Sequence, residues 1–175
     1  HLLLNPRMPA EQRHALERAF ERAGSTASFL AGEPMTGHIA LQTSGSTGKG
    51  GAEFGVLVLL SKRAFLASAV AVNEAFDATS ADAWLNPLPF FHVGGLSVCA
   101  RASASKARVH EFAEGWGANE YAERVEATNA TLSSLVPTQL FDLVRARRAA
   151  PRSLRAVFVG GGALQRPVFL AARQL

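Results

Sequence analysis

Short apolar segments alternate with segments of helical character along most of the chain. The pattern predicts strands at His38 to Gln42, Phe54 to Leu60, Trp84 to Leu88, Ala107 to Phe112, Ala130 to Val136 and Leu154 to Val159. It predicts helices over Pro9 to Ala23, Ser61 to Phe76, Gly94 to Ser105, Asn119 to Thr128, Thr138 to Arg148 and Arg166 to Arg173. Strands that alternate with helices of about 10–15 residues are typical of a layered, mostly parallel α/β sheet with helices on both faces.

Two of these segments carry expectations about burial. Phe54 to Leu60 is a continuous apolar run, which indicates a buried strand. The helix that follows begins at Ser61, whose hydroxyl can cap it. Ala67, Ala71 and Ala75 lie on one face of that helix, and we expect this face to pack closely on a sheet.

Composition indicates one folded domain and excludes several classes of protein. Hydrophobic residues make up 48% of the 175 residues and charged residues 18%, which is incompatible with a disordered chain. A single cysteine, Cys99, excludes a disulfide framework, and no Cys/His cluster has metal-ligand spacing, so we expect a reducing, cytoplasmic location and no metal-ligating residues. We expect Cys99 to be a buried small residue rather than a nucleophile. No apolar run approaches the roughly 18–20 residues that span a bilayer.

The net charge of +4 raises the question of nucleic-acid binding. The arginines are scattered, however, and the chain has one tyrosine for base stacking. The one tight cluster, Arg145, Arg147 and Arg148, is interpreted as the solvated end of a helix, where cations interact favourably with the helix dipole. We therefore expect no nucleic-acid partner.

A Gly/Ser/Thr-rich segment directly follows the strand expected at His38 to Gln42. Its glycines allow backbone N–H groups to turn toward a polyphosphate, and its hydroxyls and lysine add donors and positive charge. The phosphate-binding candidates are Thr43, Ser44, Gly45, Ser46, Thr47, Gly48 and Lys49. The segment does not match a P-loop, because Thr43 replaces its first glycine and Gly50 replaces the Ser or Thr after the lysine. A flexible Ser/Gly linker is the alternative interpretation.

Three later segments occur in the order and spacing of one enzyme superfamily. They are Leu88-Pro89-Phe90-Phe91-His92-Val93-Gly94-Gly95-Leu96, Leu135-Val136-Pro137-Thr138-Gln139-Leu140 and Val159-Gly160-Gly161-Gly162-Ala163-Leu164. Together with Thr43 to Gly48, residues 38–175 resemble the adenylate-forming enzymes, which include acyl-CoA synthetases, nonribosomal adenylation domains and luciferases. Within that superfamily, the sequences of His92 to Leu96 and of Ser134 to Leu140 are most similar to those of o-succinylbenzoate–CoA ligases of menaquinone synthesis.

The resemblance implies an ATP-dependent carboxylic acid–CoA ligase that forms an acyl-adenylate. ATP, Mg²⁺ and coenzyme A are the implied cofactor and co-substrates, and the partner is a small-molecule carboxylic acid. The implied roles are catalysis and acyl binding for His92, substrate binding for Gly94, Gly95 and Arg101, and adenine binding for Gly160, Gly161 and Gly162. The residues alone leave other interpretations open. His92 can be a packed core residue, and Gly94 and Gly95 can simply start a helix. Arg101 can be a solvated surface arginine, and Gly160 to Gly162 can be a plain strand-to-helix turn.

Two departures from the superfamily pattern bear on activity. Gly50 and Gly51 stand where the family has Pro-Lys, and the segment 50–55 is extra, so Lys49 is the nearest substitute for the loop lysine. The family's later motifs and its small C-terminal domain, with a catalytic lysine, are absent. We therefore expect residues 1–175 to be part of the large N-terminal AMP-binding domain, truncated at both ends and inactive alone. Another acyl-CoA synthetase, an adenylation domain or a degenerate, non-catalytic nucleotide-binding module are the alternatives.

Overall fold

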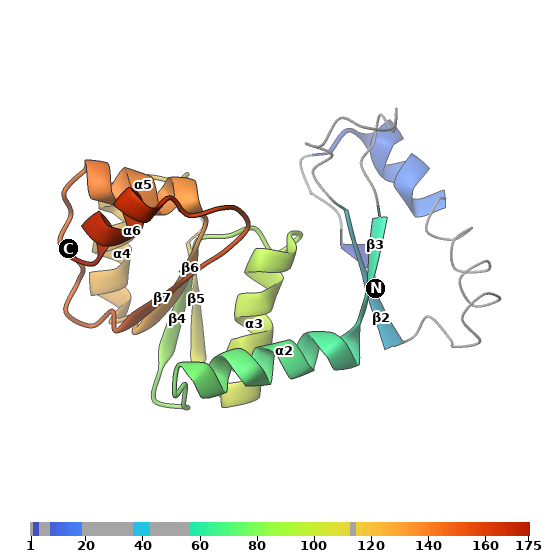
Figure 1. Cartoon of the computed structure of the whole chain (residues 1–175). Coiled ribbons are helices and arrows are strands. Elements are labelled where there is room, and N and C mark those ends of the chain that lie inside the picture. The colour runs from blue at the N-terminus through green and yellow to red at the C-terminus, as the bar shows by residue number, and fades with distance from the viewer. Residues whose placement is uncertain (1, 4–7, 19–36, 43–56, 113–114) are drawn as a thin grey trace. The chain divides into compact units, whose positions relative to one another are not determined.

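The computed structural model describes residues 2–3, 8–18, 37–42, 57–112 and 115–175 (Figure 1). These residues form two compact units. Unit 1 comprises His1–Ala67 and Phe90–Val93, and unit 2 comprises Ser68–Pro89 and Gly94–Leu175.

Unit 1 contains a small sheet with the strand order β1-β2-β3. The strands are β1 (Leu2–Leu3), β2 (His38–Gln42) and β3 (Leu57–Ser61). β1 runs parallel to β2, whereas β2 and β3 are antiparallel, with His38 opposite Ser61. This antiparallel pair belongs to a separate small sheet and is the exception to the parallel pairing expected from the sequence.

The strand expected at Phe54 to Leu60 is confirmed over its last part, and residues 54–56 lie outside the described residues. Its predicted burial is wrong at Val58 and Leu59, which are 37% and 36% exposed. Because Val58 and Leu59 point to opposite faces of the strand, neither face of β3 is fully covered by the described residues. The N-terminal helix is confirmed over 10–18, where Leu16 is buried, and the rest of its expected range is not described.

Unit 2 contains a four-stranded, wholly parallel sheet with the order β5-β4-β6-β7 (Figure 1). The strands are β4 (Ala83–Asn86), β5 (Arg108–Glu111), β6 (Leu132–Leu135) and β7 (Ala156–Val159). The helices that connect or follow them are α3 (Val93–Ser105), α4 (Ala118–Thr128), α5 (Pro137–Arg145) and α6 (Arg166–Ala172). Every strand and helix expected from Trp84 onward is thus confirmed, with shifted ends, and the alternation does produce a parallel sheet.

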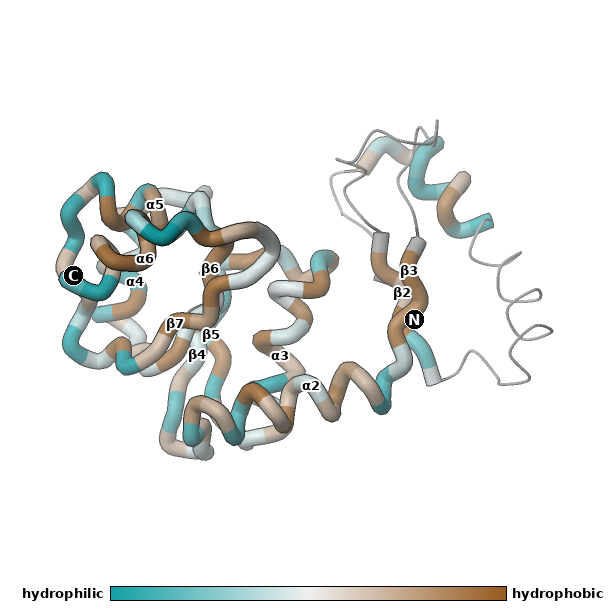
Figure 2. The backbone as a smooth tube through the Cα atoms, in the orientation of Figure 1, coloured by the Kyte–Doolittle hydropathy of each residue, from teal (hydrophilic) through white to brown (hydrophobic). Residues whose placement is uncertain are grey.

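Helices cover both faces of this sheet, as predicted. Trp84 and Leu132 are register partners and pack with Val98 and Ala102 of α3 on one face. On the other face, Leu85 packs in a larger core with residues of α4 and α5, namely Tyr121, Val125, Leu140 and Leu143. Figure 2 shows this apolar character along β7. Neighbouring residues of β4 therefore belong to opposite cores, which is the pattern of a strand buried on both faces.

Helix α2 (Lys62–Ala75) confirms the expected helix but not its expected packing face. The Ser61 hydroxyl accepts a hydrogen bond from Ala64 N at 3.4 Å, as the predicted cap requires. The alanines at 67, 71 and 75 are exposed, however, and the buried residues are Ala69 and Asn73. Asn73 Nδ2 donates to the carbonyl of Arg101 on α3 at 2.7 Å. This buried polar contact fixes the rotation of α2 and turns the alanine face away from the packing interface.

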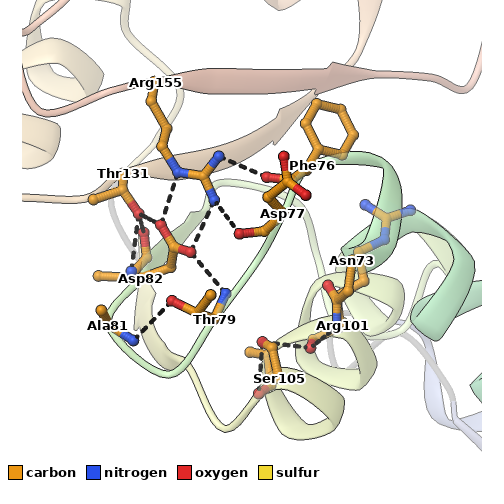
Figure 3. A network of polar contacts seen from close by, with 12 residues as sticks. Asn73, Phe76, Asp77, Thr79, Ala81, Asp82, Arg101, Ser105, Thr131 and Arg155 are labelled. Atoms are coloured by element: carbon orange, nitrogen blue, oxygen red, sulfur yellow. Dashed lines mark hydrogen bonds and ion pairs between the residues drawn. The ribbon is translucent and has the colours of Figure 1, made fainter.

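A polar network ties together the amino ends of three strands (Figure 3). Arg155, which precedes β7, donates to both carboxylate oxygens of Asp82 at 2.9 and 2.8 Å, and Asp82 precedes β4. Thr131, which precedes β6, donates to Asp82 at 2.6 Å and accepts from Ala83 N at 3.1 Å. Arg155 also donates to the carbonyls of Phe76 and Asp77 after α2. The hydrogen bonds from Arg155 hold the pKa of Asp82 well below its usual range, against the opposing effect of burial.

Replacing Asp82 by Asn should lower the free energy of unfolding of the 175-residue chain by about 2 kcal/mol at pH 7, because Arg155 loses its carboxylate. The folded-state pKa of Asp82 is depressed, so its stabilisation is complete above the unfolded-state value of about 4 and declines as the pH falls below it. Urea unfolding at pH 7 and at about pH 3 should show the difference between wild type and D82N shrinking in acid. The exposed change E123Q is the control, with an expected effect within about 0.5 kcal/mol. A difference that does not depend on pH would contradict this role for the ion pair.

Candidate functional site

The carboxyl ends of β4, β6 and β7 lie at one edge of the parallel sheet of unit 2. The chain leaves β4 through α3 to reach β5 on one side, and leaves β6 through α5 to reach β7 on the other. The connections therefore diverge between β4 and β6. Ligands of open α/β sheets bind outside the carboxyl ends of the strands at such a switch point. We call this end of the sheet, where β4, β6 and β7 finish, the carboxyl edge, and it is the candidate site.

Asn86 organises the turn that follows β4. It is 1% exposed, and its side chain accepts a hydrogen bond from Leu88 N and donates to Gly95 O, both at 3.2 Å. The residue thereby ties the end of β4 to the first turn of α3. Asn86 was not predicted as a site residue, although a polar residue at the end of an apolar strand and before Pro87 is a signal that could have identified it.

The two glycines of this turn allow the backbone to approach closely. A Cβ atom at Gly95 would lie 2.3 Å from the Pro89 carbonyl oxygen and 2.4 Å from that of Leu88. At Gly94 it would lie 3.1 Å from the Leu88 side chain. The glycines thus belong to the start of α3, which was one interpretation left open by the sequence, and they also permit close packing of the backbone. Their proposed contact with substrate stays a prediction.

The glycine turn after β7 packs on the segment after β6. Gly160 N donates to Leu135 O at 3.1 Å, and Cβ atoms at Gly161 and Gly162 would be 3.4 and 3.7 Å from Val136 and Pro137. Gly161 has a φ of +82°, a conformation that strains other residues. Gly161 and Gly162 are exposed, so their backbone is accessible at the candidate edge. The Gln139 side chain accepts from Val136 N at 3.0 Å and fixes the start of α5.

Arg101 on α3 is buried, which corrects the interpretation of a solvated surface arginine. It is 6% exposed, and its guanidinium donates to Ser134 Oγ at 3.0 Å. The guanidinium carbon lies 4.2 Å from the ring centre of Phe158 and 5.8 Å from that of Trp84. Burial lowers the pKa of Arg101. No carboxylate among the described residues pairs with this buried cation, so its charge lacks a counter-ion there.

Phe158 connects Arg101 with the glycine turn. The Arg101 guanidinium lies over its ring, and a Cβ at Gly160 would lie 3.2 Å from the ring edge. Phe158 and Ser134 are register partners on neighbouring strands. The structure thus brings together two segments that the sequence had assigned separately, Arg101 and Gly160 to Gly162.

His92 belongs to unit 1 and is exposed, so the packed-core interpretation is wrong for this residue. Its ring centre lies 4.6 Å from that of Phe91 at an interplanar angle of 53°. The predicted phosphate-binding residues, Thr43 to Lys49, lie outside the described residues. Their role and the catalytic role of His92 remain predictions.

The other residues singled out by the sequence lack features of reactive groups. Cys99 is half-buried, and burial raises the pKa of its thiol, which disfavours the nucleophilic thiolate. Arg145 and Arg147 are exposed at the end of α5, as expected. Within the described ranges, no three His, Cys, Asp or Glu side chains are grouped as a metal ion would require, and no helix is long and apolar enough to cross a membrane.

Comparisons with known proteins identify the family of this chain. The model of the family described as AMP-binding enzyme matches residues 32–175. The chain is 31% identical to the 2-succinylbenzoate–CoA ligase of Bacillus cereus over 153 residues, 86% of this chain and 30% of that protein. It is 28% identical to the Bacillus subtilis ligase over 134 residues, 77% and 26% of the two chains. The chain therefore spans less than a third of these curated relatives.

Solved structures give the same result. The o-succinylbenzoate coenzyme A synthetase of Bacillus subtilis, in complex with ATP and magnesium, matches 78% of this chain and 27% of its own with a TM-score of 0.67 and 26% identity. The Escherichia coli enzyme with a bound analogue of OSB-AMS matches the same shares with a TM-score of 0.63 and 29% identity. Because the family model covers residues 32–175, which is most of the sequence, this chain belongs to the AMP-binding enzyme family.

Proposed function

We propose that this chain is part of an ATP-dependent acid–CoA ligase that acts through an acyl-adenylate, and that its acid is 2-succinylbenzoate. The observation that carries the proposal is Arg101, a buried cation beside the exposed glycine turn that lacks a carboxylate partner among the described residues. A guanidinium binds a carboxylate through paired hydrogen bonds, and a dicarboxylic acid has one carboxylate to spare after activation of the other. The identity to 2-succinylbenzoate–CoA ligases supports the choice of acid.

The reaction has two steps. In the first, an oxygen of the acid attacks the α-phosphorus of ATP, a new oxygen–phosphorus bond forms, and pyrophosphate leaves. In the second, the coenzyme A thiolate attacks the acyl carbon, and AMP leaves with the electron pair of the broken carbon–oxygen bond. Mg²⁺ would neutralise phosphate charge in the first step, and donors around the phosphates stabilise the charge that moves onto pyrophosphate.

The residues of this chain divide between the two substrates. Ser44 to Gly48 would donate to the β- and γ-phosphates, and Lys49 would supply the positive charge. The backbone of Gly160 to Gly162, which is exposed at Gly161 and Gly162, would lie beside adenine. His92, Gly94 and Gly95 would line the acyl pocket, with Arg101 on the second carboxylate.

The Gly50-Gly51 departure favours a second candidate, a nucleotide-binding module without catalysis. The family lysine that would bind the phosphates is replaced there, and only Lys49 is close in sequence. Such a module would bind ATP but would not exchange pyrophosphate. Another acyl-CoA synthetase or an adenylation domain would exchange it with a different acid.

A chimera tests the ligase proposal, because the chain spans 26% of the Bacillus subtilis ligase. In it, residues 1–175 replace the matching part of that protein. ATP–pyrophosphate exchange that depends on 2-succinylbenzoate is the expected result. A folded chimera that binds ATP without exchange for any acid would favour the non-catalytic module.

The phosphate loop is tested in the same chimera by the double change S46A/T47A. Each lost hydrogen bond to a charged acceptor costs roughly 1.5–3 kcal/mol, so acid-dependent exchange should fall by on the order of 10²–10⁴-fold. Acid binding should change far less. Unchanged exchange in the double variant would mean that the segment is a linker.

Arg101 is tested by R101K together with a change of substrate. Lysine keeps the charge but cannot make the bidentate contact, so KM for 2-succinylbenzoate should rise about 10- to 100-fold with KM for ATP unchanged. The analogue 4-oxo-4-phenylbutanoate lacks the ring carboxylate and should be used equally by both proteins. An equal loss with both acids would show that Arg101 acts only through packing against Phe158.

A further inference from the structure

A cavity lies at the C-terminal end of α3, away from the carboxyl edge of the sheet. Its volume is about 290 Å³. It lies between the end of α2, the loop that follows it, and the last turn of α3. The lining residues all belong to unit 2 and are Val70, Asn73, Glu74, Asp77, Ala78, Thr79, Ala104 and Ser105.

The charge around this cavity is negative. Its two ionisable lining groups are the carboxylates of Glu74 and Asp77, both exposed. The last turns of α2 and α3 contain no basic residue. A helix C-terminus carries partial negative charge and favours a cation nearby. Arg155, which contacts the loop after α2, is held by Asp82 and by two backbone carbonyls, and a second cation, the exposed Lys106, follows the lining residue Ser105.

A buried acceptor without a partner points to a ligand at the same place. Asn73 is 7% exposed, and its Nδ2 is committed to Arg101 O at 2.7 Å. That contact fixes which end of the amide is nitrogen, because a carbonyl accepts only from a donor. Asn73 Oδ1 is buried and has no hydrogen-bond partner. Figure 3 shows the Asn73 side chain beside Arg101 and Ser105.

The other walls favour an organic cation over a metal ion. Val70, Ala78 and Ala104 give the cavity an aliphatic lining. Among the described residues, no three acidic, His or Cys side chains are grouped to hold a metal. Hard divalent cations need six or more oxygen ligands at fixed distances, whereas an ammonium group needs a few acceptors and tolerates open geometry.

We propose that this cavity binds a primary ammonium group on a short aliphatic chain. The ammonium donates to Asn73 Oδ1, the carboxylates of Glu74 and Asp77 balance its charge, and its methylene groups lie against the aliphatic walls. Alkylamines are protonated at pH 7, because their pKa is close to the value of about 10.4 for lysine.

The test measures binding of n-butylammonium and putrescine to the 175-residue chain by NMR. Titration should shift the side-chain amide signals of Asn73, with a Kd on the order of 1 mM. The neutral isostere n-butanol should not bind. Calcium chloride should not shift the same signals at equal concentration.

Two variants with matched controls separate the site from general charge attraction. E74Q/D77N removes both carboxylates, and A104L narrows the cavity with both retained; each should weaken binding at least about 10-fold. Asn suits position 77, where φ is 48°. E123Q/E126Q on α4 makes the same change in net charge and should weaken binding less than about 2-fold. Circular dichroism confirms folding of each protein.

The proposal is overturned by several results. One is the absence of binding up to about 50 mM amine, a concentration well above the expected Kd. Equal weakening by E123Q/E126Q would mean nonspecific attraction. Equal binding of n-butanol would identify an apolar cavity only, and tighter binding of calcium at the same residues would identify a metal site.

Discussion

The amino ends of β4, β6 and β7 are joined by the Asp82 carboxylate, which accepts hydrogen bonds from Arg155 and Thr131. These strands have four residues each and so extend only about 13 Å, at roughly 3.3 Å per residue. A displacement at one end of so short a strand is transmitted to the other. The register that places Ser134 beside Phe158 at the carboxyl edge therefore depends on an ion pair at the opposite edge.

The burial of the Arg101 guanidinium near the carboxyl edge destabilises the fold. A buried guanidinium has lost water, and a neutral hydroxyl at Ser134 with a ring contact at Phe158 compensates this loss only in part. Packing alone does not require a charge here, because an apolar side chain could fill the same space beside Trp84. We propose that an anionic substrate completes the hydrogen bonding of this guanidinium.

Periodicity alone predicted the order of strands and helices in unit 2, because parallel strands and their crossover helices produce strong local patterns. It failed where a tertiary polar contact determines which face of a helix is buried. On α2, the bond from Asn73 to Arg101 O turns the helix away from its alanine face. On α3, small residues occur on every side, so hydropathy could not show that Arg101 shares the buried face with Val98 and Ala102. Asn86 differs from these two cases, because its place before Pro87 at the end of an apolar strand was a usable signal and its partners, Leu88 and Gly95, are near it in sequence.

Helix α3 connects the two proposed sites. Its 13 residues extend about 20 Å, with the positive end of its dipole at the edge proposed for anionic substrates and the negative end at the cavity proposed for an ammonium ion. Arg101 contributes to both regions. Its guanidinium lies over Phe158 near the glycine turn, and its carbonyl holds the amide of Asn73 that lines the cavity. A ligand that bonds to Asn73 Oδ1 therefore acts on a side chain already bonded to the backbone of Arg101. Any energetic coupling through this residue has to be reciprocal, so an acid bound at Arg101 would change ammonium affinity by the same factor that ammonium changes acid affinity.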